Sequence, residues 1–157
     1  MKLQFWSIGK AHDSQLKDAI NDFTQRIGRY IQVEWKTIPP PKNAAALTEQ
    51  ALKKAEGETI LSLMGKDDWL VLLDETGRQL TSPQLAQLLE QRALDSTKMV
   101  VFLIGGAFGV DEAVKKRANF CWSLSPLVFP HMIARLLLAE QVYRAYTILN
   151  NEKYHHI

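Results

Sequence analysis

Two short segments in the last third of the chain could bind a small ligand. The first, Gly105-Gly-Ala-Phe-Gly109, directly follows the apolar run 100–104. Its glycines allow the backbone to turn sharply and to approach a ligand closely. The segment lacks the Gly-x-Gly-x-x-Gly spacing of dinucleotide-binding loops and the Gly-Lys-Ser/Thr ending of a P-loop. Alone, it indicates either a ligand-binding loop or a tight turn between a strand and a helix.

The second segment, residues 123–130, carries no charged side chain. It offers two serines, Ser123 and Ser125, and otherwise only main-chain N–H and C=O groups. A loop of this kind suits an apolar, adenine-like ring that is held by backbone hydrogen bonds. The alternative is an apolar loop that covers the core.

Four side chains outside these segments could act on a substrate. His131 and Arg135 stand at the start of the last apolar segment, and Tyr154 and His155 lie in the tail. His131 could take a proton or contact nucleic acid, or it could cap and pack the helix. The tail could stack on an unstacked base, or it could be a frayed terminus. His155 and His156 have no further nearby His or Cys, so we expect no metal site.

The elements that must position these residues alternate between strand and helix. Apolar periodicity predicts four strands, at 2–8, 31–38, 69–73 and 99–104. The helices predicted between and after them span 14–30, 43–64, 82–94, a short stretch from about 111, and 132–149. The two later strands are apolar at successive positions, which is typical of strands buried on both faces. We therefore expect an α/β fold, a three-layer α/β/α arrangement with a mainly parallel sheet.

In such sheets, ligands bind beyond the carboxyl ends of the strands. Asp74, Gly105 and Ser125 each follow an apolar strand pattern, so we expect them to meet at one crevice. Residues 75–81 are expected to form a loop there. Ser82 would cap the following helix, with Pro83 at its first position.

The predicted helix 132–149 is apolar on nearly every side, and such a helix must be buried on nearly every side. Its arginines, Arg135 and Arg144, are nine positions apart and project from opposite faces. One face can pack on the chain's own sheet, and the other then needs a partner. We expect a two-fold homodimer built on this helix.

Length, composition and charge restrict the kind of protein that this sequence can encode. The 157 residues, 46% hydrophobic and 23% charged, predict one globular domain spanning 1–157. The formal charge of +2 means that nucleic-acid affinity must come from a local patch. One cysteine, Cys121, excludes a disulfide framework within the chain. With no visible signal peptide and no apolar run near the roughly 20 residues of a membrane span, we expect a cytoplasmic protein without membrane contact.

Taken in order, several motifs resemble those of the RlmH family. They are Leu73-Asp74, Leu103–Gly106 with Gly109, Leu124-Ser125 leading to Phe129-Pro-His131, Glu140–Arg144 and Tyr154-His155, with Met1-Lys-Leu and Gly9-Lys10 at the start. Each motif alone is only weakly specific for the family, but the order and spacing of the whole set are specific. The resemblance covers the whole chain.

The resemblance implies a SPOUT-class methyltransferase, a homodimer with a carboxy-terminal trefoil knot. Enzymes of the family use S-adenosyl-L-methionine to methylate N3 of a pseudouridine in 23S rRNA on the assembled ribosome. By matching position, the implied cofactor-binding residues are Leu73, Gly105, Gly106, Leu124, Ser125, Pro126, Leu127, Val128 and Phe129. The candidates for a catalytic role are His131, Arg135, Tyr154 and His155.

The sequence departs from the family pattern in two places. Glu152-Lys153 precedes Tyr154 and His156-Ile157 follows His155, while Ala107-Phe108 follows Gly106. Two other hypotheses about the function remain open at this point. One is a ribosome-associated binding protein with the same pocket but no turnover. The other is a flavodoxin-type nucleotide-binding domain that uses the glycine loop for phosphate.

Overall fold

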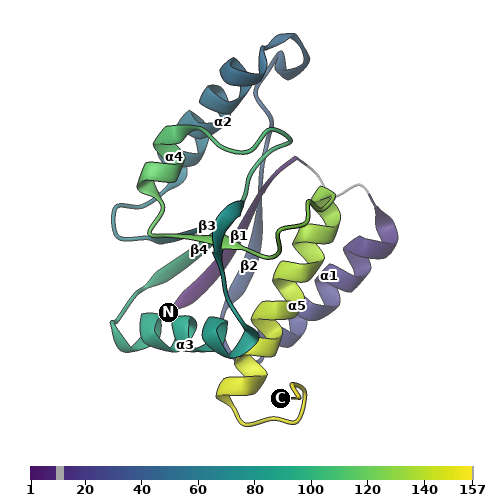
Figure 1. The fold of residues 1–157 in the computed structure, drawn as a ribbon, viewed down its shortest axis with the longest axis vertical. Helices are drawn as coiled ribbons and strands as arrows, with labels where there is room; N and C mark the ends of the chain where they lie inside the picture. Colours follow the sequence, from purple (N-terminus) through teal and green to yellow (C-terminus); the bar gives the residue numbers. More distant parts are fainter. Residues whose placement is uncertain (10–12, 157) are drawn as a thin grey trace.

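The computed structural model describes residues 1–9 and 13–156, so Lys10 and Ile157 of the quoted motifs lie outside the described residues. Five parallel strands form one sheet in the order β2-β1-β4-β3-β5 (Figure 1). The strands are β1 (Lys2–Ile8), β2 (Val33–Ile38), β3 (Trp69–Gln79), β4 (Met99–Ile104) and β5 (Phe120–Ser123). The helices are α1 (Ser14–Ile27), the short 3-10 helix η1 (Ala44–Ala46), α2 (Glu49–Leu63), α3 (Ser82–Leu94), α4 (Glu112–Arg117) and α5 (His131–Leu149).

Helices cover both faces of the sheet. Helices α1, α3 and α5 lie on one face, and α2 and α4 lie on the other (Figure 1). Along β4, Val100, Phe102 and Ile104 pack into the first core, while Val101 and Leu103 pack into the second. The predicted three-layer α/β arrangement is confirmed, and so is the burial of β4 on both faces.

The central strands end at the same edge of the sheet. Ile104 of β4 is paired with Ser7 of β1 and with Leu73 of β3, and Leu73 is also paired with Trp122 of β5. Because these strands are parallel, the segments that follow them leave the sheet side by side. This register brings together the segments expected to form a crevice.

Strand β3 is longer than predicted, since it continues through the expected loop 75–81 to Gln79. Both Leu73 and Arg78 are paired with Trp122, so the residues between them bulge out of the ladder. A Cβ at Gly77 would lie 2.7 Å from the main-chain carbon and oxygen of Cys121, so this close approach requires glycine. The second pairing depends on β5, which is distant in sequence, and local periodicity could not predict it.

Two helix starts also differ from prediction. The predicted helix 43–64 is divided into η1 and α2, and α2 begins after Thr48, whose side chain accepts a hydrogen bond from the Ala51 N–H. The cap of α3 is Thr81 rather than Ser82, because Thr81 forms a reciprocal capping box with Gln84. Ser82 instead donates a hydrogen bond to Gln141 on α5.

The first predicted helix and the second predicted strand are shorter where they meet: α1 ends at Ile27 and β2 begins at Val33. Asp13 caps α1 by accepting hydrogen bonds from the N–H groups of Gln15 and Leu16. The predicted start of the fourth helix near Asp111 is confirmed, with Asp111 as the residue before α4.

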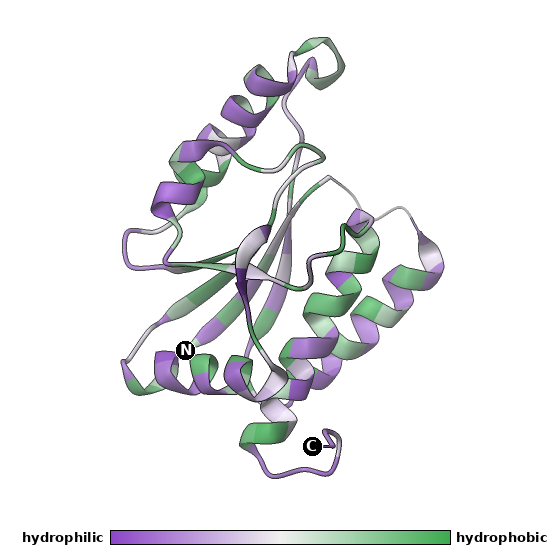
Figure 2. Ribbon diagram, in the orientation of Figure 1, coloured by the Kyte–Doolittle hydropathy of each residue, from purple (hydrophilic) through white to green (hydrophobic). Residues whose placement is uncertain are grey.

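Helix α5 packs between α1 and α3, and none of its residues is classed as exposed. Met132 and Ala139 join Ile20 of α1 in a small apolar cluster. In Figure 2, the ribbon of α5 is coloured largely as apolar, whereas the outer part of α2 is coloured mainly as polar. Neighbours within the chain therefore cover much of this apolar helix. In the described part of the chain, no helix is long and apolar enough to cross a bilayer.

Candidate functional site

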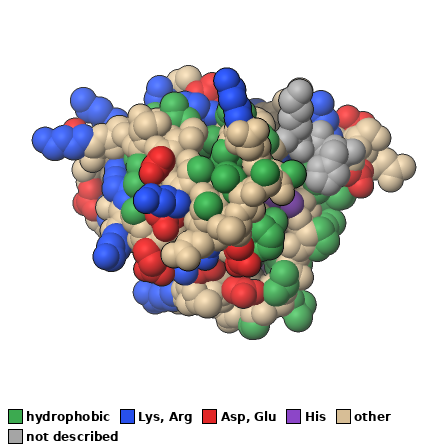
Figure 3. Space-filling view, turned by 90° about the horizontal axis from the view of Figure 1, so that it is seen from above, with side chains coloured by type: hydrophobic (Ala, Val, Ile, Leu, Met, Phe, Trp, Pro, Cys, Tyr) green, Lys and Arg blue, Asp and Glu red, His purple; other side chains and the backbone are tan. Residues whose placement is uncertain are grey.

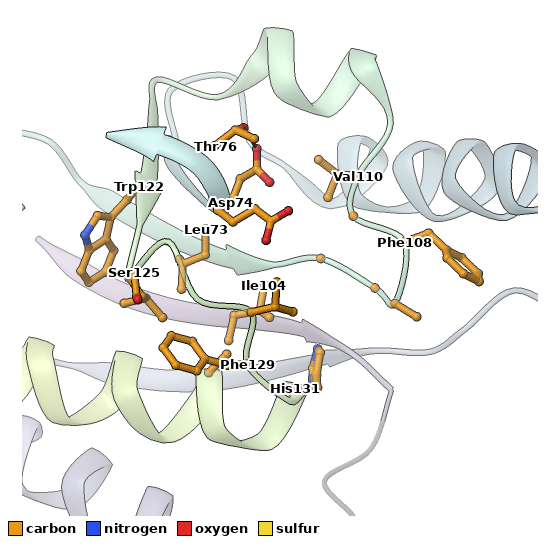
Figure 4. Close-up of a pocket in the computed structure, with 18 of the residues that line it drawn as sticks. Leu73, Asp74, Thr76, Ile104, Phe108, Val110, Trp122, Ser125, Phe129 and His131 are labelled. Atoms are coloured by element: carbon orange, nitrogen blue, oxygen red, sulfur yellow. Dashed lines mark hydrogen bonds between the residues drawn. The ribbon is translucent and has the colours of Figure 1, made fainter. Parts of the chain in front are cut away.

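A cavity of about 560 Å³ opens at the carboxyl edge of the sheet, a volume typical of sites for small organic ligands. Its walls come mainly from the bulged part of β3, from the segments after β4 and β5, and from the start of α5 (Figure 4). Asp74, Gly105 and Ser125 all line it, as expected from the strand ends. The other lining residues from the motif segments are Leu73, Ile104, Gly106, Gly109, Leu124, Leu127, Val128, Phe129 and His131.

The glycine loop turns very tightly at the cavity wall. A Cβ at Gly105 would lie 2.7 Å from Val110 Cγ1 and 3.3 Å from the main-chain carbon of Gly109. Gly109 has φ +85°, and its N–H donates a 3.1 Å hydrogen bond to the Gly106 carbonyl. The loop is thus both a tight turn and a cavity wall, and the two interpretations of its sequence are compatible.

The second loop is held in shape by its serines. Ser123 Oγ donates to the Ser125 carbonyl at 2.9 Å, and the Leu127 N–H donates to Ser125 Oγ at 3.0 Å. Leu127 and Val128 line the cavity yet remain 68% and 78% exposed. Pro126 is exposed and does not line the cavity, unlike the other residues between Leu124 and Phe129. A ligand that filled the cavity would cover this apolar surface.

Charged side chains line the cavity as well, and of these only Asp74 was expected at the crevice. They are Lys53 from α2, Asp74 and Glu75 from β3, and Lys115 from α4. Thr76 donates a hydrogen bond to the Asp74 carboxylate. Figure 3 shows apolar side chains in the middle of the face seen from above, with basic and acidic side chains around them. The position of Asp74 after a strand was a usable signal, but nothing local marked Lys53 or Lys115.

Arg135 lies behind His131 instead of facing the cavity. Its side chain is 4% exposed, and its Nε donates a 3.0 Å hydrogen bond to His131 Nδ1. A second nitrogen of the guanidinium donates to the Gly9 carbonyl at 2.9 Å, and burial lowers the pKa of Arg135. His131 itself lines the cavity at the start of α5 (Figure 4). Arg135 therefore links His131 to Gly9, the residue that follows β1.

The described part of the tail is docked on α5 through Tyr154 and His155. Tyr154 donates a 3.0 Å hydrogen bond to Glu140 Oε1, and its ring packs edge-to-face on Tyr143. Arg144 forms an ion pair with Glu140 and lies 4.7 Å above the Tyr154 ring. The same guanidinium is 3.3 Å from His155 Nδ1. An aromatic ring and two basic groups are thereby held together.

Within one chain, the four candidate catalytic residues form two separate groups. Tyr154 is anchored at Glu140, nine residues along α5 from His131, which is a rise of about 14 Å. Nine residues also correspond to a net half turn, so Glu140 and His131 face opposite sides of the helix. Tyr154 and His155 do not line the cavity of their own chain.

Comparison with known proteins identifies relatives of this chain. The family model described as "Predicted SPOUT methyltransferase" matches residues 1–155. A relative from Cytophaga hutchinsonii, named ribosomal RNA large subunit methyltransferase H, is 42% identical over 99% of this chain and 100% of its own length. A relative of the same name from Parabacteroides distasonis is 44% identical, over 99% of both chains.

The chain belongs to the RlmH family of SPOUT methyltransferases. The family prediction is thereby confirmed along almost the whole chain. A solved structure titled as a probable methylase family protein from Haemophilus influenzae covers 97% of this RlmH chain and 67% of its own, with a TM-score of 0.53. At 12% identity this likeness shows the fold alone. The trefoil knot stays a prediction.

Proposed function

We propose that the protein uses S-adenosyl-L-methionine to methylate N3 of a pseudouridine in 23S rRNA on the assembled ribosome. The observation that carries the proposal is the cavity. Its walls combine the glycine loop with the second loop, the two segments that the family motifs assign to the cofactor. The relatives named as rRNA methyltransferases support the choice of substrate. Residues 1–157 would form one enzymatic domain, and a ribosomal substrate would place it in the cytoplasm.

The cavity fits such a cofactor. Its second-loop side is apolar, with Leu124 and Phe129 half-buried in the wall, and suits an adenine ring. At Gly105 the absence of a side chain lets the loop pack tightly against Val110, so that its main chain forms the cavity wall. Leu73, Gly106, Ser125, Leu127 and Val128 would complete the binding surface, whereas Pro126 would contribute through its main chain only.

The bound cofactor supplies an activated methyl group, so the protein's residues mainly need to align the acceptor base. Because Nδ1 of His131 accepts a hydrogen bond from Arg135, the proton of the neutral ring is on Nε2. His131 is then a hydrogen-bond donor rather than a proton acceptor. Arg144 likewise faces Nδ1 of His155. This arrangement favours stabilisation of a deprotonated N3 by positive charge over proton transfer to a histidine.

The separation of the tail from its own cavity supports a homodimer. Tyr154 and His155 can approach a cofactor only if they act on the cavity of a second subunit, because their contacts hold them on the opposite side of α5. We propose that each active site combines the cavity of one subunit with the tail of the other.

The decisive test is mass spectrometry of 23S rRNA from a strain that lacks the gene, with and without the restored gene. The methyl group should disappear and then return, whereas unchanged methylpseudouridine would refute the proposal. Calorimetry with S-adenosyl-L-methionine, flavin mononucleotide and ATP separates this function from the flavodoxin-type alternative. Ribosome binding without incorporation of methyl groups would instead support the alternative of a ribosome-associated binding protein.

A further inference from the structure

Glu56, in the middle of α2, is a buried carboxylate that the proposed mechanism does not use. Its side chain is 8% exposed, and no hydrogen bond or ion pair to it is found within residues 1–9 and 13–156. Its oxygens lie 2.8 Å and 3.0 Å from where a Cβ at Gly106 would stand. Burial raises the pKa of this carboxyl group.

The carboxylate lies against the glycine loop that lines the cavity. Gly106 lines the cavity on one side and meets Glu56 on the other. Because Gly106 has no side chain, no bulky group separates the charge of Glu56 from a ligand on the far side of the main chain. An ionised carboxylate without a partner is costly to bury, and a nearby positive charge reduces that cost.

The two ends of the cavity differ in the part of a ligand that they suit. The apolar second loop suits the adenine ring, which leaves the side of the cavity formed by the glycine loop, with Gly106, for the charged methionine part. In S-adenosyl-L-methionine the sulfur is a positively charged sulfonium. Loss of the methyl group leaves S-adenosylhomocysteine, whose thioether sulfur is neutral.

We propose that Glu56 is a specificity-determining residue, which favours binding of the charged cofactor over its neutral product from behind Gly106. The proposal rests on the proposed use of S-adenosyl-L-methionine. Its effect on the enzyme would be to assist product exchange after each methyl transfer.

The acidic residues that line the cavity are weaker candidates for this role. Glu75 is exposed, so solvent screens its charge. Asp74 is half-buried and accepts a hydrogen bond from Thr76. Glu56 is more deeply buried than either, and a charge acts more strongly in a less polar environment.

Calorimetry on the full chain can test the proposal through the ratio of two dissociation constants, one for S-adenosyl-L-methionine and one for S-adenosylhomocysteine. Glu56→Gln removes the charge and keeps the shape. We expect it to weaken binding of the cofactor about tenfold and to leave product binding within about twofold. Glu58→Gln is the matched control, because Glu58 lies on the same helix and is exposed; both constants should stay unchanged.

Equal weakening of both ligands in Glu56→Gln would overturn the proposal, because it would show a packing role. Two dissociation constants that both stay unchanged would overturn it as well. Glu56→Met, which removes the charge with an apolar side chain of similar length, gives the same comparison if the glutamine variant does not fold. If the unaltered protein bound neither ligand, the proposed function itself would fail, and this result is distinct from a ratio that stays constant.

Discussion

At the scale of single residues, the cavity depends as much on absent side chains as on present ones. Gly105 and Gly106 leave room for Val110 and Glu56, respectively, and any Cβ there would meet these residues at less than 3 Å. The main chain of the loop can therefore serve as a ligand surface. The substitutions that test this surface most directly are small ones.

Gly105→Ala should reduce affinity for S-adenosyl-L-methionine by about tenfold or more, because the new methyl group displaces the loop. The clash is with Val110 Cγ1 at 2.7 Å. Calorimetry on the single variants and on Gly105→Ala/Val110→Ala forms a double-mutant cycle. Partial recovery in the double variant supports this cause; affinity losses that simply add would argue against it.

His155→Ala should reduce methylation at least about tenfold while cofactor affinity changes by less than about twofold. The reason is that His155 lies with Arg144 and Tyr154, away from the cavity of its own chain. His156→Ala is the control, since this adjacent histidine is exposed. The rate of methyl incorporation into ribosomes measures methylation, and calorimetry with S-adenosyl-L-methionine measures cofactor affinity. Equal loss of both properties would contradict a role in the methylation step.

At the scale of elements, the tail is tied to helix α1 as well as to α5. Tyr30, which follows α1, donates a 2.5 Å hydrogen bond to Glu152 Oε1. The Tyr30 ring stacks on Tyr146 of α5 with ring centroids 5.9 Å apart. The junction of α1, α5 and the tail thus depends on a neutral phenol.

Burial, followed by the hydrogen bond to Glu152, raises the pKa of Tyr30 to about 12 from its usual 10.0. A raised pKa favours the neutral phenol in the folded state, so this contribution to stability is complete below pH 10 and is lost as pH rises towards 12. Urea unfolding across this window should show a larger decrease in the free energy of unfolding for the unaltered protein than for Tyr30→Phe. Parallel decreases would show that Tyr30 is not responsible.

At the scale of the whole molecule, the proposed active site is shared between two chains, and mixed dimers can test this. One parent, Gly105→Ala, has a defective cavity and an intact tail, and the other, His155→Ala, has the reverse. Random exchange of subunits should restore about a quarter of the unaltered activity, since half of the dimers then contain one complete site. No recovery after verified exchange would mean that each tail serves its own cavity. Sedimentation of the unaltered protein as a stable monomer at micromolar concentration would exclude a shared site altogether.

Much of the fold was predictable because it follows from local patterns. Strands β1 and β4 begin and end as their apolar runs do, and α5 starts within one residue of the predicted helix. Burial on both faces could be inferred for β4 because its residues are apolar at successive positions. The continuation of β3 to Gln79 was missed because it depends on pairing with β5.

The sequence by itself determined the α/β class, the family and the two loops at the cavity, since periodicity, glycine spacing and ordered motifs are properties of the chain. Only the tertiary structure decided which side chains meet. It placed Arg135 behind His131, docked Tyr154 on Glu140, and set Glu56 against Gly106 across 50 residues of sequence. Such contacts arise when helices pack on a sheet, and no local pattern encodes the partner that a buried polar group will face.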